Sequence, residues 1–201
     1  MVIALRVIAG RARGMLLKSK PGLNVRPTAV RVKEAYFSMI NRSLVGASFL
    51  DLYAGYGGVG IEALSRGARH VVFVDNSPVA CDVIRHNLER TGFLSASQVI
   101  QASIDVALQR LQQRGCGAYD HIFLDPPYEV PSLERILEAV LLSGMVGERT
   151  LCTFQFDRRR HMPEQIMNYS KVDERAYGRT KLAFYRREEA ESEDSGLSRQ
   201  L

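Results

Sequence analysis

The sequence predicts an α/β fold in which helices cover both faces of a mostly parallel, doubly wound sheet. From about residue 46 to 157, short apolar runs alternate with helical patterns of the length that connects parallel strands. A glycine-rich loop follows the first of these runs, and several of the runs end in an aspartate. A chain of 201 residues is long enough to bury one full core of this kind.

The spacing of apolar residues predicts the elements of this domain in order. Strands are expected at residues 48–53, 70–75, 97–101, 121–124 and 150–156. Helices are expected between them at residues 58–66, 78–91, 104–114 and 132–142.

Further elements are predicted at both ends of the chain. The apolar residues at the N-terminus predict a first strand, and residues 28–41 predict a helix after Pro27. Residues 171–176 and 181–186 predict a hairpin that turns at residues 177–180. The polar residues 188–201 predict a disordered tail.

Charge divides the chain into a basic N-terminal extension, residues 1–42, and a domain, residues 43–187. The extension carries nine basic residues and one acidic residue, a net charge of +8 against −3 for the rest. Such a basic segment predicts a polyanionic partner. The sequence has no run of ~20 apolar residues, no CxxC pair and no histidine pattern. We therefore expect a cytoplasmic protein that uses neither membrane nor metal, and we expect it to be a monomer.

The glycine loop predicts a nucleoside cofactor. Its residues 55–60, GYGGVG, match the dinucleotide pattern GxGxxG, which is weak evidence alone. Asp51 precedes the loop, and a carboxylate there repels a pyrophosphate but pairs with a cationic amine. Asp75 ends the second strand, where an acid accepts hydrogen bonds from a ribose in either NAD or S-adenosylmethionine. Asp51 therefore favours S-adenosylmethionine.

A third segment, residues 101–105, lies where an adenine is expected. Ser103 or Asp105 can bond the ring or its amine while Ile104 packs on a face, and Ser103 can also cap the following helix. The predicted cofactor-binding residues are Asp51, Ala54, Gly55, Gly57, Asp75, Asn76, Ser103 and Ile104.

The fourth strand ends in Asp125-Pro126-Pro127-Tyr128, which we interpret as the catalytic motif. Proline fixes its own φ and holds the preceding residue extended, so the Asp125 carboxylate and the Pro126 carbonyl become two rigid acceptors. Two acceptors followed by an aromatic ring can bind a planar group that carries an NH₂. The acceptors then stabilise charge that develops on the nitrogen during methyl transfer.

These motifs together resemble those of Rossmann-like methyltransferases that modify amino groups. More specifically, RVIAGRARG at residues 6–14, PGL at 21–23, RPTAVRVKEAYF at 26–37 and GIEALSRGA at 60–68 are similar to the RsmD family. The resemblance covers residues 4–186. It implies methylation of a guanine N2 in bacterial 16S ribosomal RNA, a seven-stranded sheet whose last two strands form an antiparallel edge, and an N-terminal extension that grips RNA.

The glycine loop departs from the family pattern at one position. The family usually reads AGSG, whereas Tyr56 stands here in place of the small hydroxyl residue. Two outcomes are open: the ring points away from the cofactor, or it reshapes the pocket.

The resemblance also implies that basic side chains hold the RNA strand around a flipped target base. The predicted RNA-binding residues are Arg11, Arg13, Lys18, Arg26 and Arg31. Arg31 can instead pair with Glu34 three positions on, which contributes only ~0.2–0.5 kcal/mol.

Other functions fit part of the pattern. The motif chemistry also suits adenine N6 in RNA or DNA, or a glutamine side-chain amide in a protein. A non-catalytic RNA-binding factor of ribosome assembly is a different class, against which the intact motif at Asp125 argues.

Overall fold

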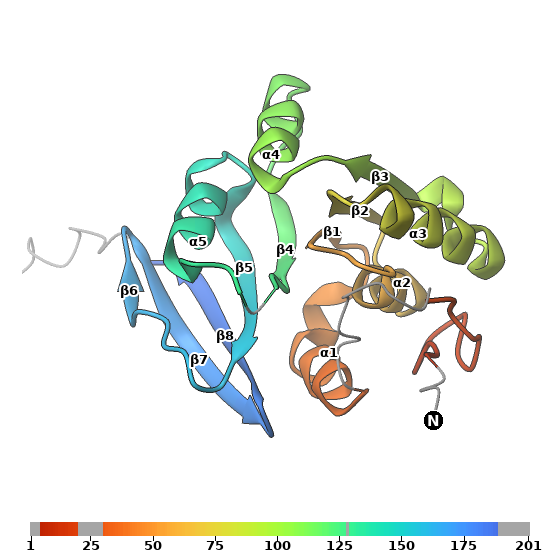
Figure 1. The fold of residues 1–201 in the computed structure, drawn as a ribbon, viewed down its shortest axis with the longest axis horizontal. Helices are drawn as coiled ribbons and strands as arrows, with labels where there is room; N and C mark the ends of the chain where they lie inside the picture. The colour runs from red at the N-terminus through yellow and green to blue at the C-terminus, as the bar shows by residue number, and fades with distance from the viewer. Residues whose placement is uncertain (1–4, 20–29, 128, 189–201) are drawn as a thin grey trace, which may run out of the picture.

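The computed structural model describes residues 5–19, 30–127 and 129–188, and Figure 1 shows a single twisted sheet with helices on both sides. Of the predictions, those for Arg26, Tyr128 and the tail lie outside these residues.

The sheet has eight described strands in the order β3-β2-β1-β4-β5-β8-β7-β6. Strands β1 to β5 are mutually parallel, and β8, β7 and β6 continue the sheet antiparallel. The strands are β1 (Ser48–Leu52), β2 (His70–Asp75), β3 (Ser97–Gln101), β4 (Tyr119–Leu124), β5 (Val146–Asp157), β6 (Gln165–Ile166), β7 (Tyr169–Tyr177) and β8 (Thr180–Arg187).

The α/β class is confirmed, but the expected strand count was too low. The additional strand, β6, has two residues, and it forms the edge beyond the hairpin of β7 and β8. A two-residue strand is too short to show an alternating apolar pattern, so sequence periodicity could not indicate it.

Among the described residues, α1 (Val30–Leu44) precedes the first strand, and four helices connect the parallel strands: α2 (Gly58–Ser65), α3 (Pro78–Thr91), α4 (Ile104–Gln113) and α5 (Leu133–Leu142). Local signals fix their ends. The Ser77 hydroxyl accepts a hydrogen bond from the Ala80 N–H at the start of α3, and Gly92, at φ 74°, ends that helix. Both bounds of α3 agree with those predicted.

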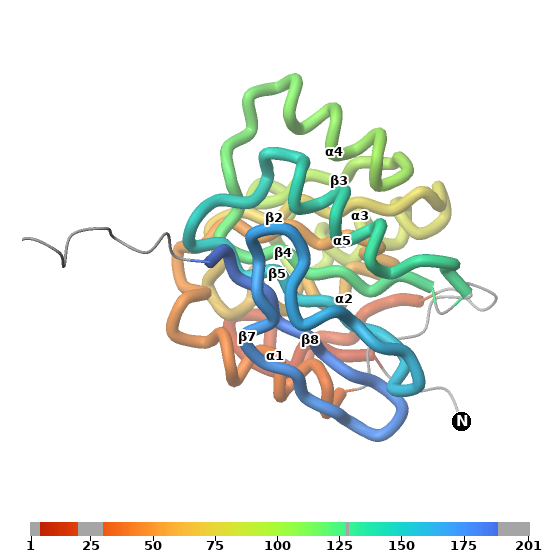
Figure 2. The backbone as a smooth tube through the Cα atoms, turned by 90° about the vertical axis from the view of Figure 1, so that its left-hand side faces the viewer, coloured from red at the N-terminus to blue at the C-terminus, as the bar shows by residue number. Residues whose placement is uncertain are grey.

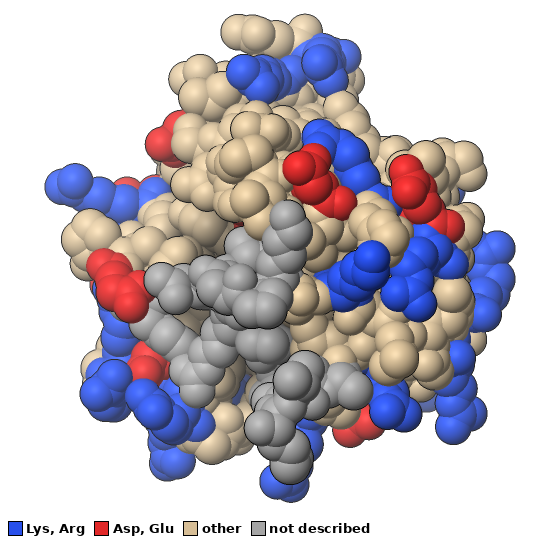
Figure 3. Space-filling view, turned by 45° about the vertical axis from the view of Figure 1, so that its right-hand side comes forward, with Lys and Arg blue, Asp and Glu red and all other residues tan. Residues whose placement is uncertain are grey.

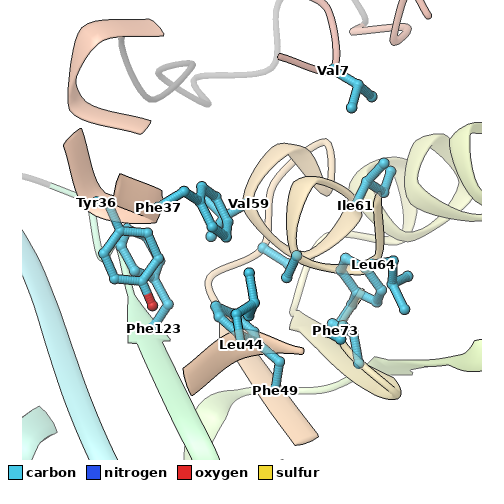
Figure 4. Packing of buried hydrophobic residues seen from close by; sticks show 14 of the residues in the cluster. Val7, Tyr36, Phe37, Leu44, Phe49, Val59, Ile61, Leu64, Phe73 and Phe123 are labelled. Atoms are coloured by element: carbon cyan, nitrogen blue, oxygen red, sulfur yellow. The ribbon is translucent and has the colours of Figure 1, made fainter. Parts of the chain in front are cut away.

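Each face of the sheet has its own core. Helices α1, α2 and α3 pack on one face with Phe49, Phe73 and Phe123, as Figure 4 shows. Helices α4 and α5 pack on the other face against alternate residues of the same strands, such as Leu50 and Leu124. This alternation is the pleat of a sheet that is buried on both sides.

The N-terminal residues form a small hairpin and not a strand of the sheet. A single antiparallel bridge joins Arg6 to Leu16, and the apolar side chains of Leu5, Val7, Ala12 and Leu17 enter the core of the α1–α3 face. The expected first strand was therefore wrong for the described residues. In Figure 2 this hairpin lies along the body of the domain.

Buried polar groups fasten the hairpin to α2. The Glu62 carboxylate, with no exposed surface, accepts hydrogen bonds from the Ile8 and Ala9 N–H groups and pairs with Arg66 and, at 3.5 Å, with Lys33. Removing one partner of such a buried group leaves an uncompensated charge, so this contact fixes the hairpin's position.

Candidate active site

The carboxyl ends of the parallel strands form one edge of the sheet, called here the carboxyl edge. Three polar side chains near it share the face that α1, α2 and α3 cover. Asp51 lies two residues after Phe49, Asp125 two residues after Phe123, and Gln155 four residues after Leu151, and those three apolar residues belong to the core of this face. Because β4 lies between β1 and β5, the pleat brings the three side chains to neighbouring positions.

Asp51 is a buried carboxylate beside the glycine loop. It is 2% exposed, and its Oδ2 accepts a hydrogen bond of 2.8 Å from the Gly60 N–H. Burial raises the pKa of Asp51 to about 8; the Gly60 hydrogen bond opposes this shift, and the nearby Asp125 and Asp75 carboxylates add to it. A cation placed next to Asp51 therefore stabilises its ionised form.

Two glycines of the loop are required by close packing. A Cβ on Gly60 would lie 2.2 Å from the Phe73 ring, so its absence lets α2 pack directly on β2. A Cβ on Gly58 would lie 2.3 Å from the Tyr56 ring. These contacts leave the start of α2 and its N–H groups close to the strand ends.

Tyr56, the departure from the family pattern, is buried. Its ring is 4% exposed and belongs to the core of the α1–α3 face, and its carbonyl accepts a hydrogen bond of 3.0 Å from Asn87 Nδ2. Burial raises the pKa of Tyr56 above its ordinary value, with the Asp125, Asp51 and Glu62 carboxylates adding to the effect. The ring lies against Gly58 at the start of α2, and Tyr56 is not among the residues that line the pocket at Asp75.

Asp75 holds the other end of the loop. Its Oδ2 accepts a hydrogen bond of 2.8 Å from the Gly55 N–H and its Oδ1 one of 2.9 Å from the Ser77 N–H. A carboxylate oxygen has a second lone pair, so each oxygen can still accept a hydrogen bond from a ligand hydroxyl.

A pocket of about 180 Å³ opens beside Asp75. Asn76, Ser103 and Ile104 line it, so the structure brings together four residues predicted to bind the cofactor. Ser103 stands at the N-cap of α4, but its side chain makes no capping hydrogen bond. The Ser103 hydroxyl is therefore available to a ligand.

Sequence reasoning missed other residues that line this pocket, among them Tyr53 and Ile136. Tyr53 directly follows β1 and has a positive φ of 61°, an uncommon conformation for a residue other than glycine. Ile136 comes from α5, over 60 residues later in the chain than Asp75 by their numbers. The positive φ at Tyr53 has no signal in the sequence, and the position of Ile136 depends on how α5 packs.

Asp125 directly follows β4 at the carboxyl edge and is half-buried. Its Oδ1 accepts a hydrogen bond of 2.7 Å from Gln155 Nε2, which comes from β5. The register aligns Leu124 with Phe154, so Asp125 and Gln155 are the next pair along the two strands. Pro126 is buried and Pro127 exposed, and the Pro127 carbonyl accepts a hydrogen bond from the Val130 N–H, which closes the turn.

Gln155 was also missed, although the sequence carries a signal for it. It is a polar residue between two phenylalanines in an apolar strand, and it is only 5% exposed. A buried polar group needs a partner, and the partner here is the carboxylate proposed to be catalytic.

The structure places the described members of the predicted RNA-binding set in three different parts of the molecule. Lys18 lies near the glycine loop, because its backbone pairs with Asn87, which also bonds the Tyr56 carbonyl. Arg31 lies in the first turn of α1. Arg11 and Arg13 lie on the hairpin turn beside Ser65 at the end of α2, and the Arg11 guanidinium is 5.2 Å from the Phe93 ring centroid.

Ser65 ends α2 and Phe93 follows α3, and both helices run from the carboxyl edge back to the opposite edge of the sheet. Arg11 and Arg13 therefore lie toward that opposite edge. No ion pair joins Arg31 to Glu34 in the part of the chain described. Figure 3 shows basic side chains spread around the rim of one face with acidic ones between them. The described basic residues among those predicted to bind RNA therefore do not form one patch around Asp125.

Neither a metal site nor a membrane-spanning helix was expected from the sequence. No cluster of three or more His, Cys, Asp or Glu side chains is arranged to hold a metal ion within residues 5–19, 30–127 and 129–188. No helix in those ranges is long and apolar enough to cross a bilayer.

The fold is that of Rossmann-like methyltransferases. Residues 5–186 match the family described as Conserved hypothetical protein 95. The chain belongs to this family, and the expected resemblance to the RsmD family is confirmed.

Individual relatives agree over nearly the whole chain. The Bacillus subtilis protein YlbH is 36% identical over 183 residues, which are 91% of this chain and 99% of that protein. The Ribosomal RNA small subunit methyltransferase D of Escherichia coli is 28% identical, over 92% of this chain and 90% of its own length. The solved structure of the Escherichia coli protein yhhF has a TM-score of 0.79 and 28% identity, and the match covers 91% of this chain and 97% of that one.

Proposed function

We propose that this protein transfers a methyl group from S-adenosylmethionine to the exocyclic N2 amine of a guanine in small-subunit ribosomal RNA. The observation that carries the proposal is the Asp125 carboxylate, held by Gln155 at the carboxyl edge next to the glycine loop. We also propose that the enzyme acts in the cytoplasm, where a ribosomal substrate is found, and that it acts as a monomer.

The residues at the loop fit S-adenosylmethionine, which supplies an electrophilic methyl group when it is bound. Asp51 is a buried carboxylate that favours a cation beside it, and the cofactor's ammonium is such a cation. Asp75 retains acceptor capacity for two ribose hydroxyls. The pocket lined by Ser103 and Ile104 offers a hydroxyl and an apolar surface to an adenine.

Asp125 and the Pro126 carbonyl act on the target amine. The lone pair of a nucleobase amine is delocalised into the ring, so the nitrogen is a poor nucleophile. Acceptors aimed at its hydrogens favour a pyramidal nitrogen and stabilise the positive charge that grows there. Asp125 can also take the proton that leaves the nitrogen. Stacking by Tyr128 stays a prediction from the sequence.

The choice of ribosomal RNA is supported by the relatives and by the charge of the chain. The Escherichia coli relative is named for the small ribosomal subunit. We propose that residues 1–42 act as the RNA-binding extension through Arg11, Arg13, Lys18, Arg26 and Arg31. Guanine is proposed because the sequence resembles the RsmD family.

The proposal is tested by incubating the protein with tritium-labelled S-adenosylmethionine and small ribosomal subunits that lack the modification. We expect label in the RNA and N2-methylguanosine in the nuclease digest, identified by mass spectrometry. N6-methyladenosine in place of N2-methylguanosine would refute the guanine assignment. Absence of transfer to any ribosomal substrate, with tight RNA binding, would support a non-catalytic binding factor.

A further inference from the structure

Three consecutive arginines, Arg158, Arg159 and Arg160, directly follow β5. Strand β5 is parallel to β4, so its end lies at the same carboxyl edge as Asp125. These arginines are not part of the basic N-terminal extension. They therefore place positive charge at the edge where the target base must enter.

Arg179 joins the same place from the turn between β7 and β8. The register pairs Asp157 with Thr180, and the Arg158 N–H donates a hydrogen bond of 2.9 Å to the Arg179 carbonyl. Arg158 and Arg179 are both exposed. Two solvent-facing arginines are thus held on adjacent segments by a backbone hydrogen bond.

The other two arginines of the run already have partners. Arg159 Nε and Nη2 donate to the two oxygens of the Asp157 carboxylate, at 3.0 and 3.1 Å. Arg160 donates to the Val130 and Pro131 carbonyls at 2.6 and 3.3 Å, which fixes the loop that follows the catalytic motif.

Because Arg159 neutralises Asp157, the acid nearest to this cluster does not cancel the remaining charge. The ion pairs formed within the described ranges include neither Arg158 nor Arg179. The Asp157 carboxylate also attracts Arg179, but neither Arg158 nor Arg179 is held in an ion pair there, so both guanidinium groups can contact a phosphate beside the loop that carries Asp125.

We propose that Arg158 and Arg179 bind the phosphate backbone of the RNA strand that flanks the target base. In the sheet order, β5 and β8 lie on one side of β4 and the cofactor residues of β1 and β2 on the other. The RNA would then be held on the side of Asp125 away from the cofactor. A guanidinium suits a phosphate because its planar N–H groups match two phosphate oxygens. This inference rests on the proposed function.

The test replaces both arginines by glutamine, Arg158→Gln with Arg179→Gln, which removes charge and leaves the backbone hydrogen bond. Binding of a fluorescent single-stranded RNA is measured by anisotropy at several salt concentrations. We expect the affinity to fall roughly tenfold at low salt. The slope of log affinity against log salt should decrease by about 1.4, because each phosphate contact to a single strand contributes about 0.7.

Arg149→Gln is the matched control. Arg149 is also an exposed arginine of β5, but it lies near the other end of this strand, away from Asp125. It should change neither affinity nor slope. An equal loss in this control would show a general charge effect and overturn the proposal, as would unchanged RNA binding in the double variant.

Methyl transfer separates this inference from the proposed function. The double variant should show a raised KM for small ribosomal subunits, an unchanged kcat and an unchanged affinity for S-adenosylmethionine. If the unmodified protein methylates subunits and the variant keeps its KM, only the role of Arg158 and Arg179 fails. If the unmodified protein transfers no methyl group, the proposed function fails first. A variant that binds an acidic protein more weakly, but RNA normally, would assign the surface to a protein partner.

Discussion

The two sides of the carboxyl edge are built differently. On the cofactor side, two of the three hydrogen bonds to the acids are local: Asp51 accepts one from Gly60, nine residues later, and Asp75 accepts one from Ser77, two residues later, whereas the third joins Asp75 to Gly55, twenty residues earlier. On the target side, Asp125 is held by Gln155, thirty residues later, and Arg160 holds the loop after Asp125 across a similar separation. Local sequence therefore specifies the first side, while strand register specifies the second.

This difference has a consequence for what each side tolerates. The cofactor side depends on glycines whose missing Cβ atoms allow close contacts, so a single added carbon disturbs it. The target side depends on side-chain hydrogen bonds between neighbouring strands, so losing one donor weakens it without changing the backbone. Substitutions on the two sides should accordingly alter different measurements.

The largest effect is expected for Asp125→Ala, which removes the acceptor on the target side. Turnover should fall by at least about 100-fold, the usual loss when one group that stabilises transition-state charge is removed. The affinity for S-adenosylmethionine, measured by calorimetry, should be nearly unchanged, because the cofactor's contacts lie on the other side. Asp125→Asn keeps one acceptor oxygen and should retain more activity. Near-normal turnover of Asp125→Ala would remove Asp125 from the catalytic role.

The same contrast explains what could be predicted from sequence. Helix α3 was predicted to the residue, because Ser77, Pro78 and Gly92 mark its ends locally. The loop and both acids of the cofactor side followed from one strand–loop–helix segment. Gln155 carried a signal as a polar residue in an apolar strand, but its partner and the position of Arg179 could not be assigned, because both arise from pairing of β5 with β4 and β8.

At the N-terminus, the sequence predicted a strand of the sheet where the described residues form a hairpin. Its apolar residues predicted a strand, but they pack on α2 and α3 and take no place in the sheet. What decides this is Glu62, whose buried carboxylate offers acceptors to the Ile8 and Ala9 N–H groups that a neighbouring strand would otherwise satisfy. No pattern within the hairpin itself indicates a partner more than fifty residues away.

Gly60→Ala tests the close packing on the cofactor side. The added Cβ would lie 2.2 Å from the fully buried Phe73 ring, so the ring or α2 must move. We expect the free energy of unfolding to decrease by about 1–3 kcal/mol, the usual cost of overpacking, with weaker cofactor binding. Gly117→Ala is the control, because no atom lies within 4 Å of a Cβ there. Chemical denaturation measures both variants, and equal stability would show that α2 adapts to the extra carbon.

Gln155→Met tests the hydrogen bond on the target side, since methionine keeps the length of the side chain but donates no hydrogen bond. A hydrogen bond to a charged group contributes about 1.5 kcal/mol or more, so kcat should fall roughly tenfold. The KM for RNA and the cofactor affinity should change little if Gln155 only positions Asp125. Gln98→Met, in β3, controls for the chemical change in a strand far from Asp125. A loss of thermal stability with normal kcat would make Gln155 structural instead.

The last effect concerns pH and returns to the cofactor side. The pKa of Asp51 in the folded protein is about 8, far above the value of 3.8 for an unperturbed carboxyl group. The stability that the protonated group contributes is therefore present below pH 4 and is lost as the pH rises through 8. A bound ammonium favours the carboxylate, so binding releases a proton in this range. The affinity for S-adenosylmethionine should accordingly rise with pH between about 5 and 8, by at most tenfold per unit.

Calorimetry at pH 6, 7 and 8 in buffers of different ionisation enthalpy measures both the affinity and the protons released. The amine of the cofactor titrates as well, so the informative quantity is the difference between the unmodified protein and Asp51→Asn. In that variant no carboxyl group can lose a proton at this position, and its affinity should vary less with pH. If the two proteins show the same pH dependence, Asp51 does not exchange a proton when the cofactor binds. The carboxylate is then either ionised before the cofactor binds or not in contact with the ammonium, and the loss of affinity in Asp51→Asn distinguishes the two.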